Sequence, residues 1–400
     1  MDLIEGLAVK NDRKILLVVL DGLGGLPRNG KTELESACTP NLDKLAAKSE
    51  LGLLTPIEAG ITPGSSAAVL ALLGYDPLQH RVGRGLLDAL GVGLDVGVGD
   101  LCCHVNLATT GPDGRVVDRR AGRVPTTLSE QLCICLQTAI PQIRDVAVTV
   151  RTVCEHHLVV VFRGPDLSDL VSDSDPISDG VMPRKVEALG PPAVRSAQLV
   201  NEFIQAASRV LGAEPSANFV LLRGFGQMPD VRSMPERFKL KPACVAAYPM
   251  YRGLAKLVGM EVLETGDTWE SEVQTAHKHK SEYDFFLLHF KETDKAGEDG
   301  ELEAKQELIE QFDEEILPQL LALKSDVLCI TGDHSTPAVM GVHSWHPVPM
   351  LLSSPYVRPQ VLVGEFGERT CACGDIGNLR SCRLMGLLLA HGLKLRRFGA

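Results

Sequence analysis

The feature that most constrains the fold of this 400-residue chain is the segment 331–337, Thr-Gly-Asp-His-Ser-Thr-Pro. It follows the apolar run 327–330, so Asp333 and His334 come where a buried strand should end, and His343 follows shortly after. Ligands of open α/β sheets gather at the carboxyl ends of the strands. A carboxylate and two imidazoles at one such edge suit a borderline divalent metal such as Mn or Zn.

Further candidate ligands come from other segments of the chain. Asp21 directly follows the apolar run 14–20, Asp294 lies just beyond the run 284–290, and Ser65 follows the loop 60–64. A single aspartate after a strand is often only a helix cap. Because three of the four ligand-bearing segments follow predicted strands, we expect these oxygen and nitrogen ligands to meet at one edge of the sheet.

Ser65 has a chemical argument of its own. A serine hydroxyl is a weak nucleophile unless a base or a metal lowers its pKa. Ser65 opens a helix of small residues (66–73), where exposed N–H groups and the helix dipole favour a phosphate or an alkoxide. The alternative is that Ser65 is an ordinary N-cap.

The order of the apolar runs indicates the fold class. Continuous apolar runs at 14–20, 243–247, 284–290 and 327–330 are typical of strands covered on both faces. Helices are expected between them, one beginning with Thr39 as N-cap and Pro40 at the first position, another from 301 to about 324. The chain therefore predicts an α/β protein with a doubly wound, mainly parallel sheet.

A second domain is predicted inside the first. Between about residues 81 and 240, strand-like runs such as 146–150 and 158–162 alternate with charged turns. We therefore expect a discontinuous domain of residues 1–80 and 241–400, with a smaller α/β domain of residues 81–240 inserted into it.

Composition excludes several classes of partner. A formal charge of −11 and only 4% aromatic residues argue against nucleic acid. No apolar stretch reaches the ~20 residues of a membrane span, so no membrane partner is expected. The first residues lack the pattern of a signal peptide, and the 11 cysteines are interpreted as reduced, structural or incidental thiols. These features predict a cytoplasmic protein.

Motifs along nearly the whole chain resemble the archaeal-type, cofactor-independent phosphoglycerate mutases. They occur in the same order at residues 21–24 (Asp-Gly-Leu-Gly), 39–43, 63–65 (Pro-Gly-Ser), 73–77, 83–85, 89–93, 118–123 (Asp-Arg-Arg-Ala-Gly-Arg), 222–224 and 332–337. That family belongs to the alkaline phosphatase superfamily of metalloenzymes. The resemblance implies an alkaline-phosphatase-like metal-binding and phosphoryl-transfer domain, with an inserted domain that binds substrate.

The resemblance also implies an activity. It is the interconversion of 2- and 3-phosphoglycerate, in glycolysis and gluconeogenesis, through a phosphoserine formed on Ser65. No 2,3-bisphosphoglycerate is needed, and the partner is a small phosphorylated substrate. Two divalent ions are implied, Mn or else Mg, Zn or Co. One would be held by Asp21, Ser65, Asp333 and His334, and the other by Asp294 and His343, with Glu298 as the candidate ligand at the position where the family has a histidine.

The substrate itself would be held by cations of the inserted domain, because guanidinium groups bind carboxylates and phosphates with two parallel hydrogen bonds. The cations implied are Arg84, Arg119, Arg120, Arg123 and Arg223, and Asp118 is a further candidate substrate-binding residue. For any one arginine the alternative is a surface ion pair. We expect a monomer or a small homo-oligomer.

The chain departs from the family at the second metal site. The family pattern is D-x-x-x-H, whereas Asp294 is followed here by Glu298, which favours harder ions. Gly25, Ser66 and His346 also replace family residues, and His346 could act as a compensating ligand. Two alternatives therefore stay open: a phosphatase or phosphomutase of the same superfamily acting on another phosphorylated metabolite, and a relative that binds without turnover.

Overall fold

A computed structural model describes residues 3–359 and 364–399 of the chain. The chain divides into two compact units, which are described separately. Unit 1 is made of Met1–Arg81 and Val231–Ala400, and unit 2 of Val82–Asp230. Among the described residues, no helix has both the length and the hydrophobicity that a membrane crossing requires.

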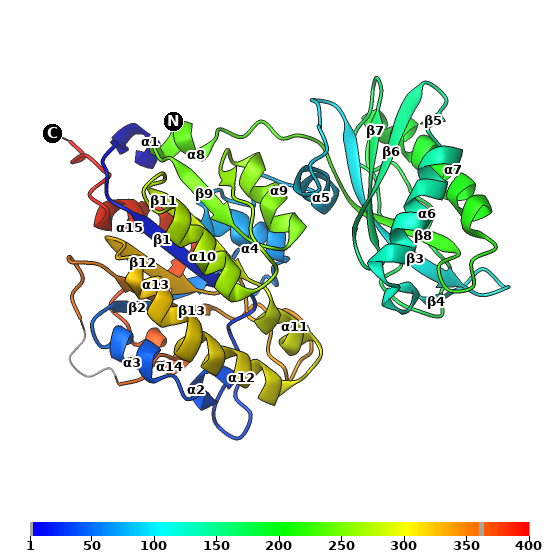
Figure 1. The fold of residues 1–400 in the computed structure, drawn as a ribbon. Helices are drawn as coiled ribbons and strands as arrows, with labels where there is room; N and C mark the ends of the chain where they lie inside the picture. The colour runs from blue at the N-terminus through cyan, green and yellow to red at the C-terminus, as the bar shows by residue number, and fades with distance from the viewer. Residues whose placement is uncertain (1–2, 360–363, 400) are drawn as a thin grey trace. The chain divides into compact units, whose positions relative to one another are not determined.

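Unit 1 is built on an eight-stranded sheet with the strand order β10-β9-β11-β1-β12-β13-β2-β14 (Figure 1). Neighbouring strands are parallel except at β13, which is antiparallel to both β12 and β2. The strands are β1 Ile15–Leu20, β2 Glu50–Thr55, β9 Pro242–Val245, β10 Glu261–Val262, β11 Phe285–Phe290, β12 Val327–Thr331, β13 Val348–Ser353 and β14 Gly377–Arg380. The prediction of an α/β fold with a mainly parallel sheet is confirmed.

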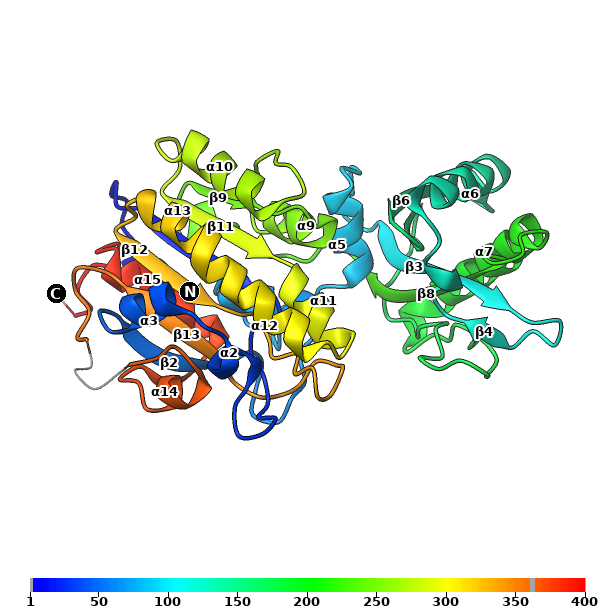
Figure 2. The same cartoon turned by 60° about the horizontal axis from the view of Figure 1, so that its bottom comes forward.

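The helices of unit 1 cover both faces of this sheet. They are α1 Leu3–Leu7, α2 Glu33–Ser36, α3 Pro40–Ala46, α4 Ser65–Leu72, α8 Met234–Phe238, α9 Pro249–Leu257, α10 Trp269–His279, α11 Glu292–Glu298, α12 Leu302–Gln311, a π-helical turn Phe312–Ile316, α13 Leu317–Ala322, α14 Glu368–Ala372, a 3₁₀ turn Ser381–Arg383 and α15 Leu384–His391. Figures 1 and 2 show α10, α12 and α13 lying across one face, with α15 on the other.

The central strands are fully buried because both of their faces are covered. All six residues of β1 are buried. Leu16 and Val18 belong to one core cluster together with Val273 of α10 and Ile309 of α12. The residues between them on β1 point to the opposite face, because successive side chains of a strand alternate. This double coverage explains why β1 is a continuous apolar run and not an alternating one.

The helix predicted from 301 to about 324 is interrupted. It consists of α12 and α13, separated by the π-helical turn that carries Asp313. Asp313 is buried, and its carboxylate accepts hydrogen bonds from the backbone N–H groups of Asn41 (3.1 Å) and Leu42 (2.6 Å). Thr39 is the N-cap residue of α3, as predicted, but makes no capping hydrogen bond. A carboxylate from a distant segment therefore caps this helix.

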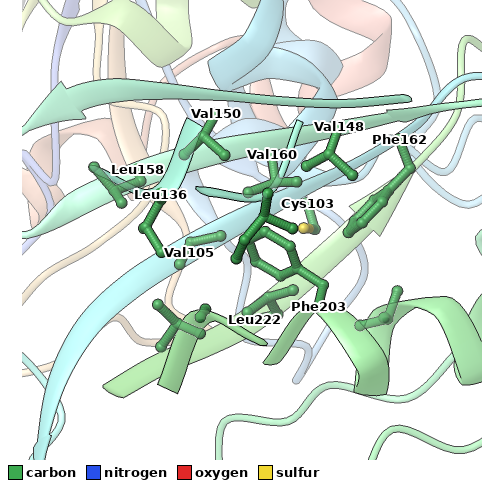
Figure 3. Close-up of a cluster of buried hydrophobic side chains, with 14 of the residues drawn as sticks. Cys103, Val105, Leu136, Val148, Val150, Leu158, Val160, Phe162, Phe203 and Leu222 are labelled. Atoms are coloured by element: carbon green, nitrogen blue, oxygen red, sulfur yellow. The ribbon is translucent and has the colours of Figure 1, made fainter. Parts of the chain in front are cut away.

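Unit 2 contains a six-stranded sheet whose paired strands are all antiparallel. Its elements are α5 Arg84–Gly91, β3 Leu101–Thr110, β4 Val116–Asp118, a 3₁₀ turn Ala121–Arg123, α6 Thr126–Ala139, β5 Gln142–Ile143, β6 Val146–Cys154, β7 His157–Arg163, a 3₁₀ turn Pro191–Ala193, α7 Val194–Leu211 and β8 Phe219–Gly226. Figure 3 shows its core, where Val105 and Val160 of the sheet gather with Leu136 of α6 and Phe203 of α7.

Candidate metal centre

The fold of unit 1 brings the predicted ligands to one edge of the sheet. Asp21 follows β1, Asp333 and His334 follow β12, and Asp294 lies in α11, which follows β11. These three strands are parallel neighbours, so their carboxyl ends meet. The backbone N–H of Asp21 donates to the carbonyl oxygen of Phe290 at 2.9 Å, which extends the pairing to the ligand itself.

The first group of ligands surrounds one imidazole nitrogen. Nε2 of His334 lies 3.2 Å from the Ser65 hydroxyl oxygen, 3.2 Å from Oδ1 of Asp21 and 3.3 Å from Oδ2 of Asp333. Ser65 is the first residue of α4, and the N-cap position belongs to Gly64. The alternative in which Ser65 is the N-cap is therefore wrong, and its hydroxyl faces the ligand group.

Each aspartate of this group has one oxygen held by the protein and one that is not. Oδ1 of Asp333 accepts hydrogen bonds from the N–H groups of Gly22 (3.1 Å) and His334 (3.0 Å). Oδ2 of Asp21 accepts from the Tyr251 hydroxyl and lies 2.9 Å from the Lys291 ammonium. The other oxygens, Asp21 Oδ1 and Asp333 Oδ2, are buried and have no hydrogen-bond partner among the described residues.

Burying carboxylate oxygens without hydrogen-bond partners costs free energy unless a positive charge lies close to them. Burial and the nearby charge of Asp21 raise the pKa of Asp333 to about 8. Burial alone would lower the pKa of His334, but Asp333 and Asp21 outweigh it and raise that pKa to about 9. Protons therefore balance the charge when no cation does. The donor set of oxygens and an imidazole fits a divalent cation.

The second group of predicted ligands lies beside the first. Nε2 of His343 is 3.5 Å from Oδ1 of Asp294 and 3.6 Å from Oε1 of Glu298. Nδ1 of His343 lies 3.0 Å from the carbonyl oxygen of Pro63, to which its N–H donates, so Nε2 keeps a lone pair for a ligand. The rings of His334 and His343 stack with centroids 3.8 Å apart. Ligand atoms of Asp294, His334 and His343 all lie within 4.8 Å of one another.

Glu298 and His346 are placed differently. The Glu298 side chain is 46% exposed, so it lies at the rim of the second group, and it is not part of the compact cluster of Asp294, His334 and His343. Nδ1 of His346 lies 3.1 Å from the hydroxyl of Ser344, and its ring stacks on Trp345. Among the described residues, His346 belongs to neither cluster of metal-ligating side chains, so the structure gives no support for it as a compensating ligand.

Several residues of the centre were not predicted from the sequence. The ammonium of Lys291 contacts carboxylates of both groups, Asp21 and Asp294. His289, inside β11, has Nε2 3.7 Å from Oδ2 of Asp21, and its ring stacks on Tyr251 with a centroid distance of 3.5 Å. The sequence offered only weak signals for these two residues. Lys291 lies three residues before Asp294, and His289 is a lone histidine in an apolar strand.

In unit 2, three of the predicted substrate-binding arginines lie near buried carboxylates. Arg119 makes two hydrogen bonds to Asp175, at 2.7 and 2.6 Å, and Nε of Arg223 lies 3.8 Å from the same carboxylate. Arg84 lies 3.6 Å from Asp88. Arg119 is thus engaged by the protein itself, and its role toward substrate stays a prediction.

The remaining predicted substrate residues form a tight loop. Asp118 accepts hydrogen bonds from the backbone N–H groups of Arg120 (2.7 Å) and Gly122 (2.6 Å), so its carboxylate shapes the loop. Ala121, Gly122 and Arg123 all have positive φ values of 46°, 65° and 51°. Three such residues in a row are costly, and strain of this kind often occurs where a loop binds a ligand. Arg120 and Arg123 are both exposed residues.

Comparison with known proteins identifies the family. The family model described as Metalloenzyme superfamily matches residues 13–391. A probable 2,3-bisphosphoglycerate-independent phosphoglycerate mutase of Aquifex aeolicus is 50% identical over 409 residues, covering 100% of both chains. A protein of Thermotoga maritima with the same name is 46% identical over 400 residues, covering 100% of this chain and 99% of its own.

Solved structures agree with this assignment. A Pyrococcus horikoshii protein superposes with a TM-score of 0.83 at 32% identity, covering 97% of this chain and 100% of its own. The cofactor-independent phosphoglycerate mutase of Thermoplasma acidophilum has a TM-score of 0.66 at 30% identity, covering 95% and 100%. The chain therefore belongs to the Metalloenzyme superfamily and, within it, to the cofactor-independent phosphoglycerate mutases.

Proposed function

We propose that this protein interconverts 2-phosphoglycerate and 3-phosphoglycerate through a phosphoserine on Ser65. The observation that carries the proposal is the Ser65 hydroxyl at the start of α4, 3.2 Å from His334 and beside two buried carboxylates with unpaired oxygens. Relatives that are 50% identical to this chain, over 98–100% of their own length, are named as probable phosphoglycerate mutases of this kind. The substrate is a small phosphorylated molecule, and the reaction is an isomerisation.

Divalent metal ions would be held by the two groups of side chains. We infer one ion on Asp21, Ser65, Asp333 and His334, and a second on Asp294, Glu298 and His343, with Mn as the first candidate and Mg, Zn or Co as others. When bound, such ions lower the pKa of the serine hydroxyl and neutralise phosphoryl oxygens. Lys291 adds a fixed ammonium between the two groups, in contact with Asp21 and Asp294.

The reaction proceeds as two phosphoryl transfers. The Ser65 hydroxyl loses its proton and attacks the phosphorus of phosphoglycerate, the P–O bond to the glycerate breaks, and the released glycerate oxygen takes up a proton. The retained glycerate then turns over. Its other hydroxyl loses a proton and attacks the phosphoserine, the P–O bond to Ser65 breaks, and the Ser65 oxygen takes up a proton. The N–H groups at the start of α4 offer donors to the phosphoryl oxygens. In unit 2, Arg120 and Arg123 would bind the carboxylate or phosphate of the substrate, with Arg84, Asp118, Arg119 and Arg223 shaping that site.

Replacing the nucleophile tests this directly. Ser65→Ala should lower mutase turnover by at least about 10³-fold, since removal of a serine nucleophile in a protease costs roughly 10⁶-fold. Labelled phosphate from 3-phosphoglycerate should also no longer be trapped on the acid-quenched protein. The adjacent Ser66→Ala, on the same helix, is the matched control and should stay within a few-fold of the unchanged protein. Substantial turnover by Ser65→Ala would refute the assignment.

Products separate the proposed function from its alternatives. With 3-phosphoglycerate the unchanged protein should form 2-phosphoglycerate, with little free phosphate. Free phosphate as the main product would favour a phosphatase, and no product with any metal tried would favour a relative that binds without turnover.

The altered second site has a predicted consequence for the metal. Glu298→His should shift the activating-ion preference from Mn and Mg toward the softer Co and Zn, because an imidazole replaces an anionic oxygen. The measurement is turnover across a series of the four ions. An unchanged ion profile would mean that Glu298 is not a ligand.

Metal affinity should depend on pH. Asp333 and His334, with pKa values of about 8 and about 9, hold protons at pH 7 when no cation is bound. Ligands must lose these protons to bind a metal, so affinity should rise with pH up to about 9, and binding at pH 7 should release protons. Calorimetric titrations with Mn²⁺ in buffers of different ionisation enthalpy measure both effects. Equal affinities at pH 6.5 and 8.5 with no proton release would contradict this prediction.

A further inference from the structure

A fully buried lysine lies directly behind the metal centre. Lys305, on α12, has 0% of its surface exposed, which is rare for a lysine. Its ammonium donates hydrogen bonds to the carbonyl oxygens of Gly22 (2.8 Å), Gly24 (3.1 Å) and Thr336 (2.9 Å). An ammonium has three N–H donors, so each of them has a backbone acceptor.

The three acceptors belong to the two loops that carry metal ligands. The β1 loop (residues 21–25) begins with Asp21, and the β12 loop (residues 333–338) begins with Asp333. The loops are also joined directly, because the N–H of Thr336 donates to Gly24 O (3.0 Å) and that of Gly22 donates to Asp333 Oδ1 (3.1 Å). Lys305 therefore ties together two backbone segments whose spacing sets the separation of Asp21 and Asp333.

Thr336, whose carbonyl oxygen accepts a hydrogen bond from Lys305, also contacts metal ligands of both groups through its hydroxyl. Its hydroxyl donates to Oδ1 of Asp294 at 2.6 Å and lies 3.0 Å from Nδ1 of His334. With Nδ1–H donating to the threonine oxygen, Nε2 of His334 faces Ser65 and the aspartates. Any shift of the Thr336 backbone would move the hydroxyl that orients Asp294 and His334.

The buried Glu33 and the partly buried Glu368 hold the same two loops through their backbone N–H groups. Glu33 accepts a hydrogen bond from the N–H of Ala338 at 2.7 Å, and Glu368 accepts one from the N–H of Gly25 at 2.9 Å. The ammonium thus holds carbonyl groups of these loops, while the carboxylates hold their amide groups.

We propose that Lys305 is a positioning residue of the metal centre, which sets the spacing of the β1 loop and the β12 loop and thereby the affinity for divalent cations. This inference rests on the metal centre of the proposed function. The competing explanation is that Lys305 stabilises the fold like any other satisfied buried group.

The chain offers a matched control for that explanation. Lys394 is equally buried, and its ammonium donates to the carbonyl oxygen of Asn11 (2.7 Å) and to the Asp284 carboxylate (3.2 Å). Asp284 directly precedes β11, so Lys394 lies at the amino end of that strand, away from its ligand-bearing carboxyl end. Lys305→Met and Lys394→Met remove the same ammonium from equally buried sites, but only the first touches the ligand loops.

The test is a Mn²⁺ titration of the metal-stripped full chain, with free Mn²⁺ followed by its EPR signal. Lys305→Met should weaken binding at one or both sites by about 10–100-fold, the usual effect of losing a residue that orients metal ligands. Lys394→Met should bind within about threefold of the unchanged protein, although both variants melt at lower temperature.

Each outcome decides a different point. If Lys305→Met binds Mn²⁺ as tightly as Lys394→Met, or if Lys394→Met weakens binding as much, the positioning role is overturned. If Lys305→Met does not fold, Lys305→Gln, which retains N–H donors on a shorter side chain, is judged by the same comparison. If the unchanged protein binds no Mn²⁺, the metal centre of the proposed function fails, and that result is distinct from failure of the positioning role.

Discussion

The chemistry of the candidate site depends on two buried carboxylates, Asp21 and Asp333, each of which has one oxygen without a hydrogen-bond partner among the described residues. Each directs one unpaired oxygen toward Nε2 of His334, and Ser65 lies against the same nitrogen. Placing these charges together inside a protein is unfavourable unless a cation or protons compensate them. Burial and the neighbouring charge of Asp21 raise the pKa of Asp333, and, against the opposing effect of burial, the two carboxylates raise the pKa of His334. A divalent cation would compensate it and activate the serine at the same time.

The rest of unit 1 keeps this unfavourable arrangement in place. Three parallel strands bring Asp21, Asp294 and Asp333 to one edge, and covering both faces of the sheet fixes the strand ends that carry them. Backbone N–H groups and the Lys291 ammonium hold the remaining carboxylate oxygens, so the unpaired ones have a defined direction. These hydrogen bonds and ion pairs within the protein fix the orientation of the ligand side chains.

Much of this could be predicted from the sequence because polar residues directly follow apolar runs. That pattern placed Asp21 and Asp333 at the ends of β1 and β12, and the small-residue segment after Ser65 indicated α4. The resemblance to a known family added the reaction. Residues 14–20 and 327–330 were informative because a strand buried on both faces leaves an uninterrupted apolar run.

Other features could not be predicted, because the local sequence around them is typical of a different environment. Lys305 lies in a helix with many charged residues, where a lysine usually indicates a solvent-exposed face, and only the tertiary structure shows it buried. His289 lies in an apolar strand and has the pattern of a core residue. The hydrogen bonds from Asn41 and Leu42 to Asp313 join segments about 270 residues apart, which no local pattern reveals.

The most direct test of this account is anomalous diffraction at the manganese edge from crystals grown with Mn²⁺. The account predicts two manganese peaks, one in contact with Ser65, Asp21, Asp333 and His334, and the other with Asp294, Glu298 and His343. A map with no manganese bound to the Ser65 oxygen would contradict the central claim, that a cation at this edge of the sheet makes that serine a nucleophile.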